Sequence, residues 1–168
     1  DAVTNSSVLN LNSGAITVSG LLTNTGTVNA SAGTLTSVEN NAAFNVNASS
    51  VVLGAFTNNG ALNFNTDFNI GDATFGSPAD TVTLDGDVFV AAGKTLTVSM
   101  AQQLRFADTL NVAENATFEV YSVGTYDQDA VALLTGGVYV ANLENAGEVL
   151  VRGLTTSAEA VLEVNNVV

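Results

Sequence analysis

The stretch that decides the fold is LTNTGTVNA at residues 22–30, because it returns twice further along the chain. FTNNGALNF at 56–64 repeats it closely, and VENNAAFNV at 38–46 follows the same template more loosely. The copies begin at positions 22, 38 and 56, so the spacing from one start to the next is first 16 and then 18. A phrase that recurs at this spacing is either a chemical site used several times or one structural unit stacked on itself.

Aligning the copies places the same kind of residue at the same position of each one. Two positions separated by one residue are apolar, the residue between them is asparagine, and a further asparagine precedes the strand. Because side chains alternate across a strand, the apolar residues face one way and the intervening asparagines face the other. The apolar sets are Val28, Phe44 and Leu62, then Ala30, Val46 and Phe64; the asparagines are Asn29, Asn45 and Asn63, then Asn24, Asn40 and Asn58.

Short runs in which apolar and polar residues alternate continue through the rest of the chain. Each is about five residues long and is bounded by Gly, Asn, Asp or Ser, as in TVTLD at 81–85 and TFEVY at 117–121. This period of two predicts half-buried strands. The one helical candidate is MAQQLRFA at 100–107, which has Met100 and Leu104 on one face, and a loop is an equal alternative there.

Repeating units of two or three short strands predict an all-β fold, a parallel β-solenoid (β-helix). Its coils would run from about 16 to about 22 residues, a length that holds two or three short strands. The longer coil is indicated by KTLTV, ATFEV and AVLEV, which begin at positions 94, 116 and 160, so that the second spacing is twice the first. Stacked coils bury their apolar columns and align equal asparagines into side-chain amide ladders. The alternative is a β-sandwich, which also consists of short, regularly spaced strands.

The chain is predicted to form a single domain over residues 1–168 with two unlike halves. Residues 1–78 hold 14 asparagines and four acidic residues. Residues 79–168 hold six asparagines, twelve acidic residues and all three basic residues. Between the halves, GDATFGSPAD at 71–80 contains the only proline, Pro78, and we interpret it as a junction within the domain.

The composition excludes several classes of function. The chain has no cysteine and no histidine, so the usual zinc, iron–sulfur and haem ligand sets and Ser–His or Cys–His catalysis are absent. A net charge of −13 argues against nucleic acid and against anionic membrane surfaces as partners. No apolar run is long enough to span a bilayer. We therefore expect no enzyme and no membrane insertion, and the polar start DAVTNSS suits a mature secreted chain.

Two pairs of carboxylates are the candidate chemical sites. Asp85 and Asp87 flank a glycine, and Asp127 and Asp129 flank a glutamine. Residues i and i+2 of a strand share a face, so either pair could gather Ca²⁺ or, as a weaker alternative, act as an acid–base couple. Neither pair is set in a recognisable calcium loop or has a basic partner, and solvated turn acids are the simplest interpretation. Calcium is the one cofactor that the sequence suggests.

The phrases LTNTGTVNA, FTNNGALNF and AGTLTS (32–37) resemble the degenerate repeats of bacterial surface β-helix proteins. These are the filamentous-haemagglutinin-like adhesins and the autotransporter passenger domains. The resemblance covers residues 8–75, and the rest of the chain only through TLTV-type strands. It implies secretion, a right-handed parallel β-helix and an adhesive or scaffolding role. It carries over no catalytic residue.

These observations predict a non-catalytic structural protein, secreted or at the cell surface, that assembles itself into a filament, sheath or layer. Terminal strands such as VLEVNNVV at 161–168 would pair with neighbouring copies and give a homo-oligomer or polymer. The alternative is a monomeric adhesin or carbohydrate-binding module. It would bind a glycan through the outward Asn and Thr rows and through Tyr121, Tyr126 and Tyr139.

Overall fold

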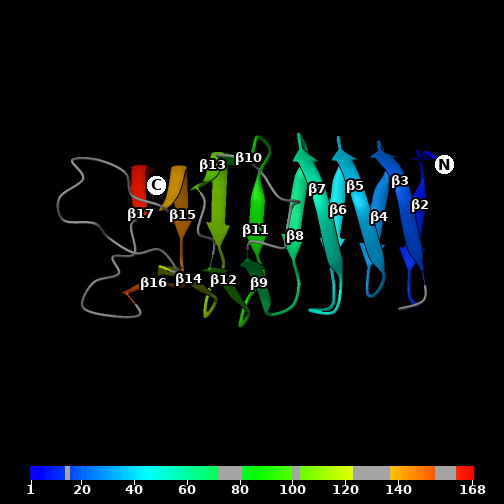
Figure 1. The fold of residues 1–168 in the computed structure, drawn as a ribbon. Coiled ribbons are helices and arrows are strands. Elements are labelled where there is room, and N and C mark those ends of the chain that lie inside the picture. The colour runs from blue at the N-terminus through cyan, green and yellow to red at the C-terminus, as the bar shows by residue number, and fades with distance from the viewer. Residues whose placement is uncertain (14–15, 72–80, 100–102, 123–136, 154–161) are drawn as a thin grey trace.

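The computed structural model describes residues 1–13, 16–71, 81–99, 103–122, 137–153 and 162–168, and this part of the chain contains strands and turns but no helix. The strands lie side by side from the N-terminal end to the C-terminal end (Figure 1). They are β1 (Val3–Asn5), β2 (Val8–Leu11), β3 (Thr17–Asn24), β4 (Thr27–Ala30), β5 (Thr34–Asn40), β6 (Ala43–Val46), β7 (Val52–Asn58), β8 (Ala61–Phe64), β9 (Phe68–Gly71), β10 (Thr81–Leu84), β11 (Val88–Val90), β12 (Thr95–Ser99), β13 (Gln103–Val112), β14 (Thr117–Ser122), β15 (Gly137–Asn145), β16 (Glu148–Gly153) and β17 (Leu162–Val167).

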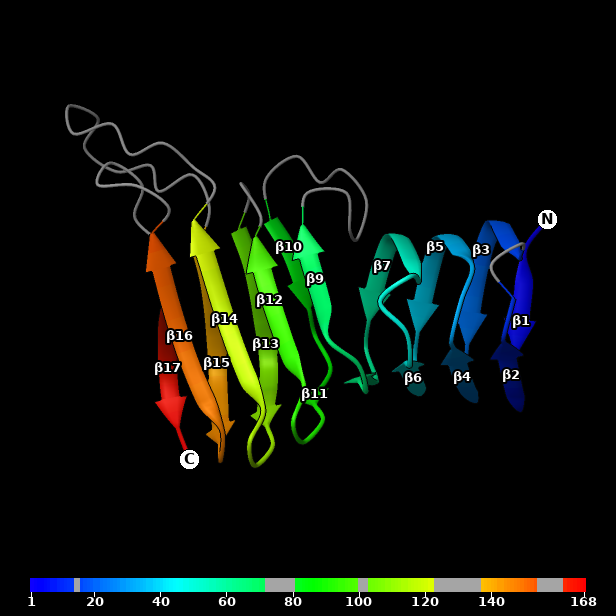
Figure 2. The same cartoon turned by 90° about the horizontal axis from the view of Figure 1, so that it is seen from below.

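Thirteen strands form one parallel sheet, and four form a second. In the large sheet, the series β1-β3-β5-β7-β10 and the series β2-β4-β6-β8-β11 both end at β13. The long strand β13 joins them because its first half pairs with β10 and its second half with β11. Strands β15 and β17 continue beyond it. The second sheet has the order β16-β14-β12-β9 and lies along the C-terminal half (Figure 2).

The register of the strands confirms the alignment that the repeated phrases predict. Val28 pairs with Phe44, which pairs with Leu62, and the asparagines between the apolar positions pair with one another in the same way. All strand pairs in the described residues are parallel, whereas a β-sandwich of the predicted kind has antiparallel sheets. The structure is therefore all-β with parallel sheets.

One apolar column runs through the molecule without interruption. Neighbouring members are register partners, so each inner side chain is covered from both sides at the strand spacing of about 4.8 Å. The six inner members are buried, whereas Leu9 is half-buried and Val167 is 68% exposed. The inner members of the column are therefore buried between their partners in the two neighbouring strands. The column is Leu9, Val28, Phe44, Leu62, Val88, Leu110, Leu143 and Val167.

The helix considered at residues 100–107 is wrong for the described part of that segment. Residues 103–107 belong to β13, in which Leu104 and Phe106 are buried and Arg105 is exposed. Both apolar side chains lie in the core. Residues i and i+2 point to the same side only in an extended chain, so this segment forms a strand and not a helix. Residues 100–102 lie outside the described residues, as does the junction at 71–80 apart from Gly71, the last residue of β9.

The longer repeat predicted for the second half is confirmed for two of its three members. Leu96 pairs with Phe118, which holds the equivalent position in ATFEV. The third member, AVLEV, does not continue this series, because Leu162 pairs with Val138 in the large sheet. Repeats in this half also vary in length more than predicted. The steps from Leu62 to Val88 and from Leu110 to Leu143 are both longer than the step from Leu96 to Phe118.

Candidate functional site

The predicted pair Asp85 and Asp87 lies at the turn between β10 and β11, not within a strand. Asp85 is exposed, and Asp87 is half-buried and accepts a hydrogen bond at 3.4 Å from the backbone N–H of Thr109 through its Oδ1. The glycine between them is buried, and its N–H donates to the carbonyl of Asn58 at 2.8 Å. The turn therefore uses Asp87 to hold the next repeat, and calcium at this pair stays a prediction.

The other predicted site residues are only partly visible. Asp127, Asp129 and Tyr126 lie outside the described residues, as does the side chain of Tyr121. Within the described ranges, no group of three or more acidic side chains could hold a metal ion. Tyr139 is half-buried, and the guanidinium carbon of Arg105 lies 4.6 Å from its ring centroid. One face of that ring is thus already covered by a cation.

The first four repeats of the structure are the strand pairs β1 and β2, β3 and β4, β5 and β6, and β7 and β8. A ladder of buried asparagines crosses all four. Asn24, Asn40 and Asn58 are fully buried, and Asn5 is 7% exposed. Each side-chain nitrogen donates to the side-chain oxygen of the next asparagine, and all three of these distances are 2.8 Å. Every donor points towards the C-terminal end, so the ladder has a single direction.

The ladder also holds the turn between the two strands of each repeat. Asn24 Nδ2 donates to the carbonyls of Gly26 and Ala43 at 3.2 and 3.0 Å, and Asn24 Oδ1 accepts from the backbone N–H of Gly26 at 3.2 Å. Asn40 repeats the pattern with Ala42 and Ala61. Burying an amide is costly unless its hydrogen-bonding groups are satisfied, and here both the donors and the acceptor are.

The ladder stops at the junction between the two halves. The register partner of Asn58 is Leu84, and the later members of the column are Phe106, Val140 and Val164. The same position is therefore polar in the first half of the molecule and apolar in the second.

A second ladder lies on the outward side of β2, β4, β6 and β8. Asn29 donates to Asn10, Asn45 to Asn29, and Asn63 to Asn45, at 2.7 to 2.8 Å. Its members are exposed or half-buried. The amide ladders that the repeated phrases predict are thus confirmed on both sides of the sheet.

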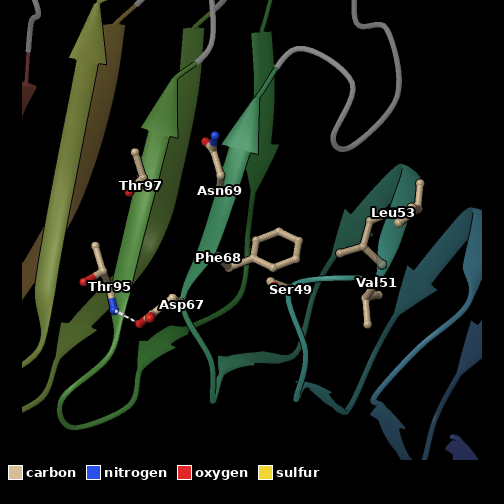
Figure 3. A pocket seen from close by; sticks show the side chains of 9 residues that line it. Ser49, Val51, Leu53, Asp67, Phe68, Asn69, Thr95 and Thr97 are labelled. Carbon is tan, nitrogen blue, oxygen red and sulfur yellow. Dashed lines mark hydrogen bonds between the residues drawn. The ribbon is translucent and has the colours of Figure 1, made fainter. Parts of the chain in front are cut away.

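A groove of about 510 Å³ lies where the second sheet begins, between the start of β7 and strands β9 and β12 (Figure 3). Phe68 points across it towards Ser49 and Val51, and Asp67 Oδ1 accepts from the backbone N–H of Thr95 at 2.9 Å. Phe68, Val51 and Leu53 are buried, whereas Val52 is 51% exposed. The groove therefore has a closed apolar floor and an accessible rim.

The groove arises from a change in repeat length. The turn at residues 47–51 leads into β7, whereas residues 65–67, at the equivalent place one repeat later, lead into β9 of the second sheet. Strand β9 begins a new sheet to which the earlier repeats supply no strand, and it pairs only with β12 among the described residues. Sequence reasoning missed this site, although NASSVVL at 47–53 and NTDFNIG at 65–71 already differ, because only the second contains a charged residue and the apolar–polar–apolar run FNI.

No helix among the residues that the structure describes is long and apolar enough to cross a membrane. Comparisons of the chain with models of protein families, with curated proteins and with solved structures give no match.

Proposed function

We propose that the chain is a structural protein of the extracellular space or cell surface. In this proposal its strands form a parallel β-solenoid, and its ends pair with further copies to build a filament, sheath or layer. The unbroken apolar column carries the proposal, because each repeat is completed by the next and the two outermost members, Leu9 and Val167, remain accessible. An accessible strand edge of this kind is a template for a further strand.

The exposed apolar side chains support pairing at the ends. Among the described residues, five of the eight large apolar side chains that are exposed lie at the two ends of the stack, on or directly beside terminal strands. They are Val3 and Val8 at one end and Val151, Val167 and Val168 at the other. Apolar columns also match between the ends, since the column that begins at Leu9 ends at Val167.

Chemistry elsewhere in the described residues offers no stronger function. The single ion pair there joins Arg152 Nε to Glu119 Oε1 at 2.8 Å between neighbouring strands, and Arg105 covers Tyr139. Both contacts link successive repeats, as the asparagine ladders do. The alternative, a monomeric adhesin or carbohydrate-binding module, is supported by the outward Asn10–Asn63 ladder, which presents a regular row of amides.

Negative-stain electron microscopy of the purified chain, with and without calcium, tests the proposal. We expect ordered filaments or sheets in the absence of any partner. Val8→Lys and Val167→Lys place a charge on an end edge and should abolish assembly. Phe89→Lys is the matched control, because Phe89 is 36% exposed but lies on β11, an inner strand that pairs with β8 on one side and β13 on the other, and it should leave assembly intact.

Two results would contradict the proposal. A chain that stays monomeric at high concentration would exclude self-assembly, and a glycan screen would then test the alternative. Assembly that persists after deletion of residues 161–168 would exclude pairing through the last strand.

A further inference from the structure

We infer that the groove beside β9 is a docking site for an extended peptide strand of a partner protein, which adds to the second sheet at the outer edge of β9. This inference is independent of the proposed end-to-end assembly, because the groove lies in the middle of the chain. Three features of the groove support it: its strand edge, its side-chain columns and its charge.

Among the described residues, no strand pairs with β9 on the side away from β12. Natural sheet edges are usually blocked by charged residues, proline or a bulge. The strand at the opposite edge of the same sheet, β16, carries Glu148 and Arg152. Strand β9 has the sequence FNIG, with neither charge nor proline, and its register with β12 is unbroken.

The side-chain columns specify what would pair there. Phe68 and Ile70 are buried and continue the columns of Leu96 and Val98, whereas Asn69 is exposed and continues the column of Thr97. A strand added beyond β9 would therefore place apolar residues beside Phe68 and Ile70 and a polar residue beside Asn69. This is the pattern of recognition by strand addition, in which backbone hydrogen bonds give affinity and alternate side chains give specificity.

The volume and charge of the groove agree with such a ligand. A volume of about 510 Å³ lies within the range of ligand-binding clefts. Of the described residues that line it, Asp67, just before β9, is the one that is charged, and the whole chain carries a net charge of −13. Complementarity therefore favours a peptide with a basic residue at the end of the strand that lies near Asp67.

The probe is a fluorescent peptide of sequence KTLTVS, which copies residues 94–99, the segment containing the strand that already pairs with β9 on its other edge. Fluorescence anisotropy should show saturable binding to the full chain. A peptide with proline in place of its central threonine loses a backbone donor and should bind roughly tenfold more weakly. Val52→Arg places a bulky cation on the rim and should weaken binding to a similar degree, whereas Leu21→Arg, on an exposed apolar site outside the groove, should not.

Amide hydrogen exchange locates the bound peptide. We expect slower exchange of the backbone amides of residues 68–71 and no change at the terminal strands. Equal binding to the chain and to Val52→Arg, or no saturable binding, would overturn the inference. Protection confined to β1, β2 or β17 would overturn it as well, and would assign the peptide to the ends that the proposed assembly uses.

Discussion

Asn40 shows how this chain keeps a polar group in its interior. Its amide is fully buried and accepts from Asn24 while donating to Asn58. The cost of removing the amide from water is offset because equivalent residues lie one strand spacing away on both sides, and because the carbonyls of Ala42 and Ala61 accept from it as well. A single asparagine at this position would be destabilising, whereas four in succession satisfy one another.

Asn40→Ala should therefore lower the free energy of unfolding by about 3 kcal/mol, because it removes the two buried ladder bonds, the one from Asn24 to Asn40 and the one from Asn40 to Asn58. Asn45→Ala is the matched control in the same repeat. It breaks two ladder bonds of similar length on the accessible side, where water can replace them, and should cost less than about 1 kcal/mol. Urea unfolding followed by circular dichroism measures both.

Asn40→Leu separates hydrogen bonding from packing at this position. Leucine is the residue that the column itself holds at Leu84, so the side chain fits the sheet, but the neighbouring amides still lose their partners. We expect a loss close to that of Asn40→Ala. A variant as stable as the unmodified chain would show that the ladder contributes nothing to stability.

The strands β12 and β14 are each preceded by the same type of four-residue turn, at residues 91–94 and 113–116. In each, the fourth residue donates its N–H to the carbonyl of the first, from Lys94 to Ala91 and from Ala116 to Ala113. The third residue has a positive φ in both, 69° at Gly93 and 60° at Asn115. Glycine and asparagine are the residues that adopt this conformation at least cost.

Asn115→Val should lower the free energy of unfolding by about 1–2 kcal/mol, because a β-branched residue is strained at positive φ. Asn115→Gly keeps the turn and should change stability by less than about 0.5 kcal/mol. Thermal unfolding of the two variants side by side gives the comparison. Equal stability of Asn115→Val and the unmodified chain would mean that the turn adopts another conformation.

Elements were predictable from the sequence where a repeat kept its length. The columns of Val28 and Asn29 follow from counting, because the spacing of the repeated phrases returns the chain to the same place in each repeat. Where the repeat lengthens, counting no longer identifies the sheet to which a strand belongs. AVLEV matches KTLTV and ATFEV in sequence, but it pairs with β15 in the large sheet.

Local pattern was ambiguous at two further places. Within residues 100–107, Met100 and Leu104 suggest a helical face, but the buried pair Leu104 and Phe106 of β13 decides for a strand. The groove could not be derived, since it depends on β9 having no partner in the preceding repeat. A groove formed by a missing neighbouring strand has no sequence motif of its own. The sequence shows it only as a change in the length of the repeat.

For the whole molecule, the dominant electrostatic property is the excess of acidic residues. The chain has sixteen acidic side chains and only three basic ones, and twelve of the sixteen lie in residues 79–168. Stacking repeats brings these charges together, so self-repulsion opposes the compact state. Raising NaCl from roughly 10 mM to roughly 500 mM shortens the Debye length from about 30 Å to a few ångströms and should raise the melting temperature measured by circular dichroism. A melting temperature that falls or stays constant would show that attractive pairs, such as Arg152–Glu119, outweigh the repulsion.

Divalent cations distinguish general screening from a specific site. Asp87 already accepts from a backbone amide and Asp85 is exposed, so we expect Ca²⁺ and Mg²⁺ at equal concentration to raise the melting temperature equally. Bulk screening depends on charge and not on ion size, whereas a calcium site prefers the larger ion with its six to eight oxygen ligands. The calcium hypothesis for this pair requires the opposite result, a larger increase with Ca²⁺ that Asp85→Asn and Asp87→Asn each remove. If the increase with Ca²⁺ is larger but survives both substitutions, the ion binds elsewhere in the chain, and Asp127→Asn and Asp129→Asn then test the second pair.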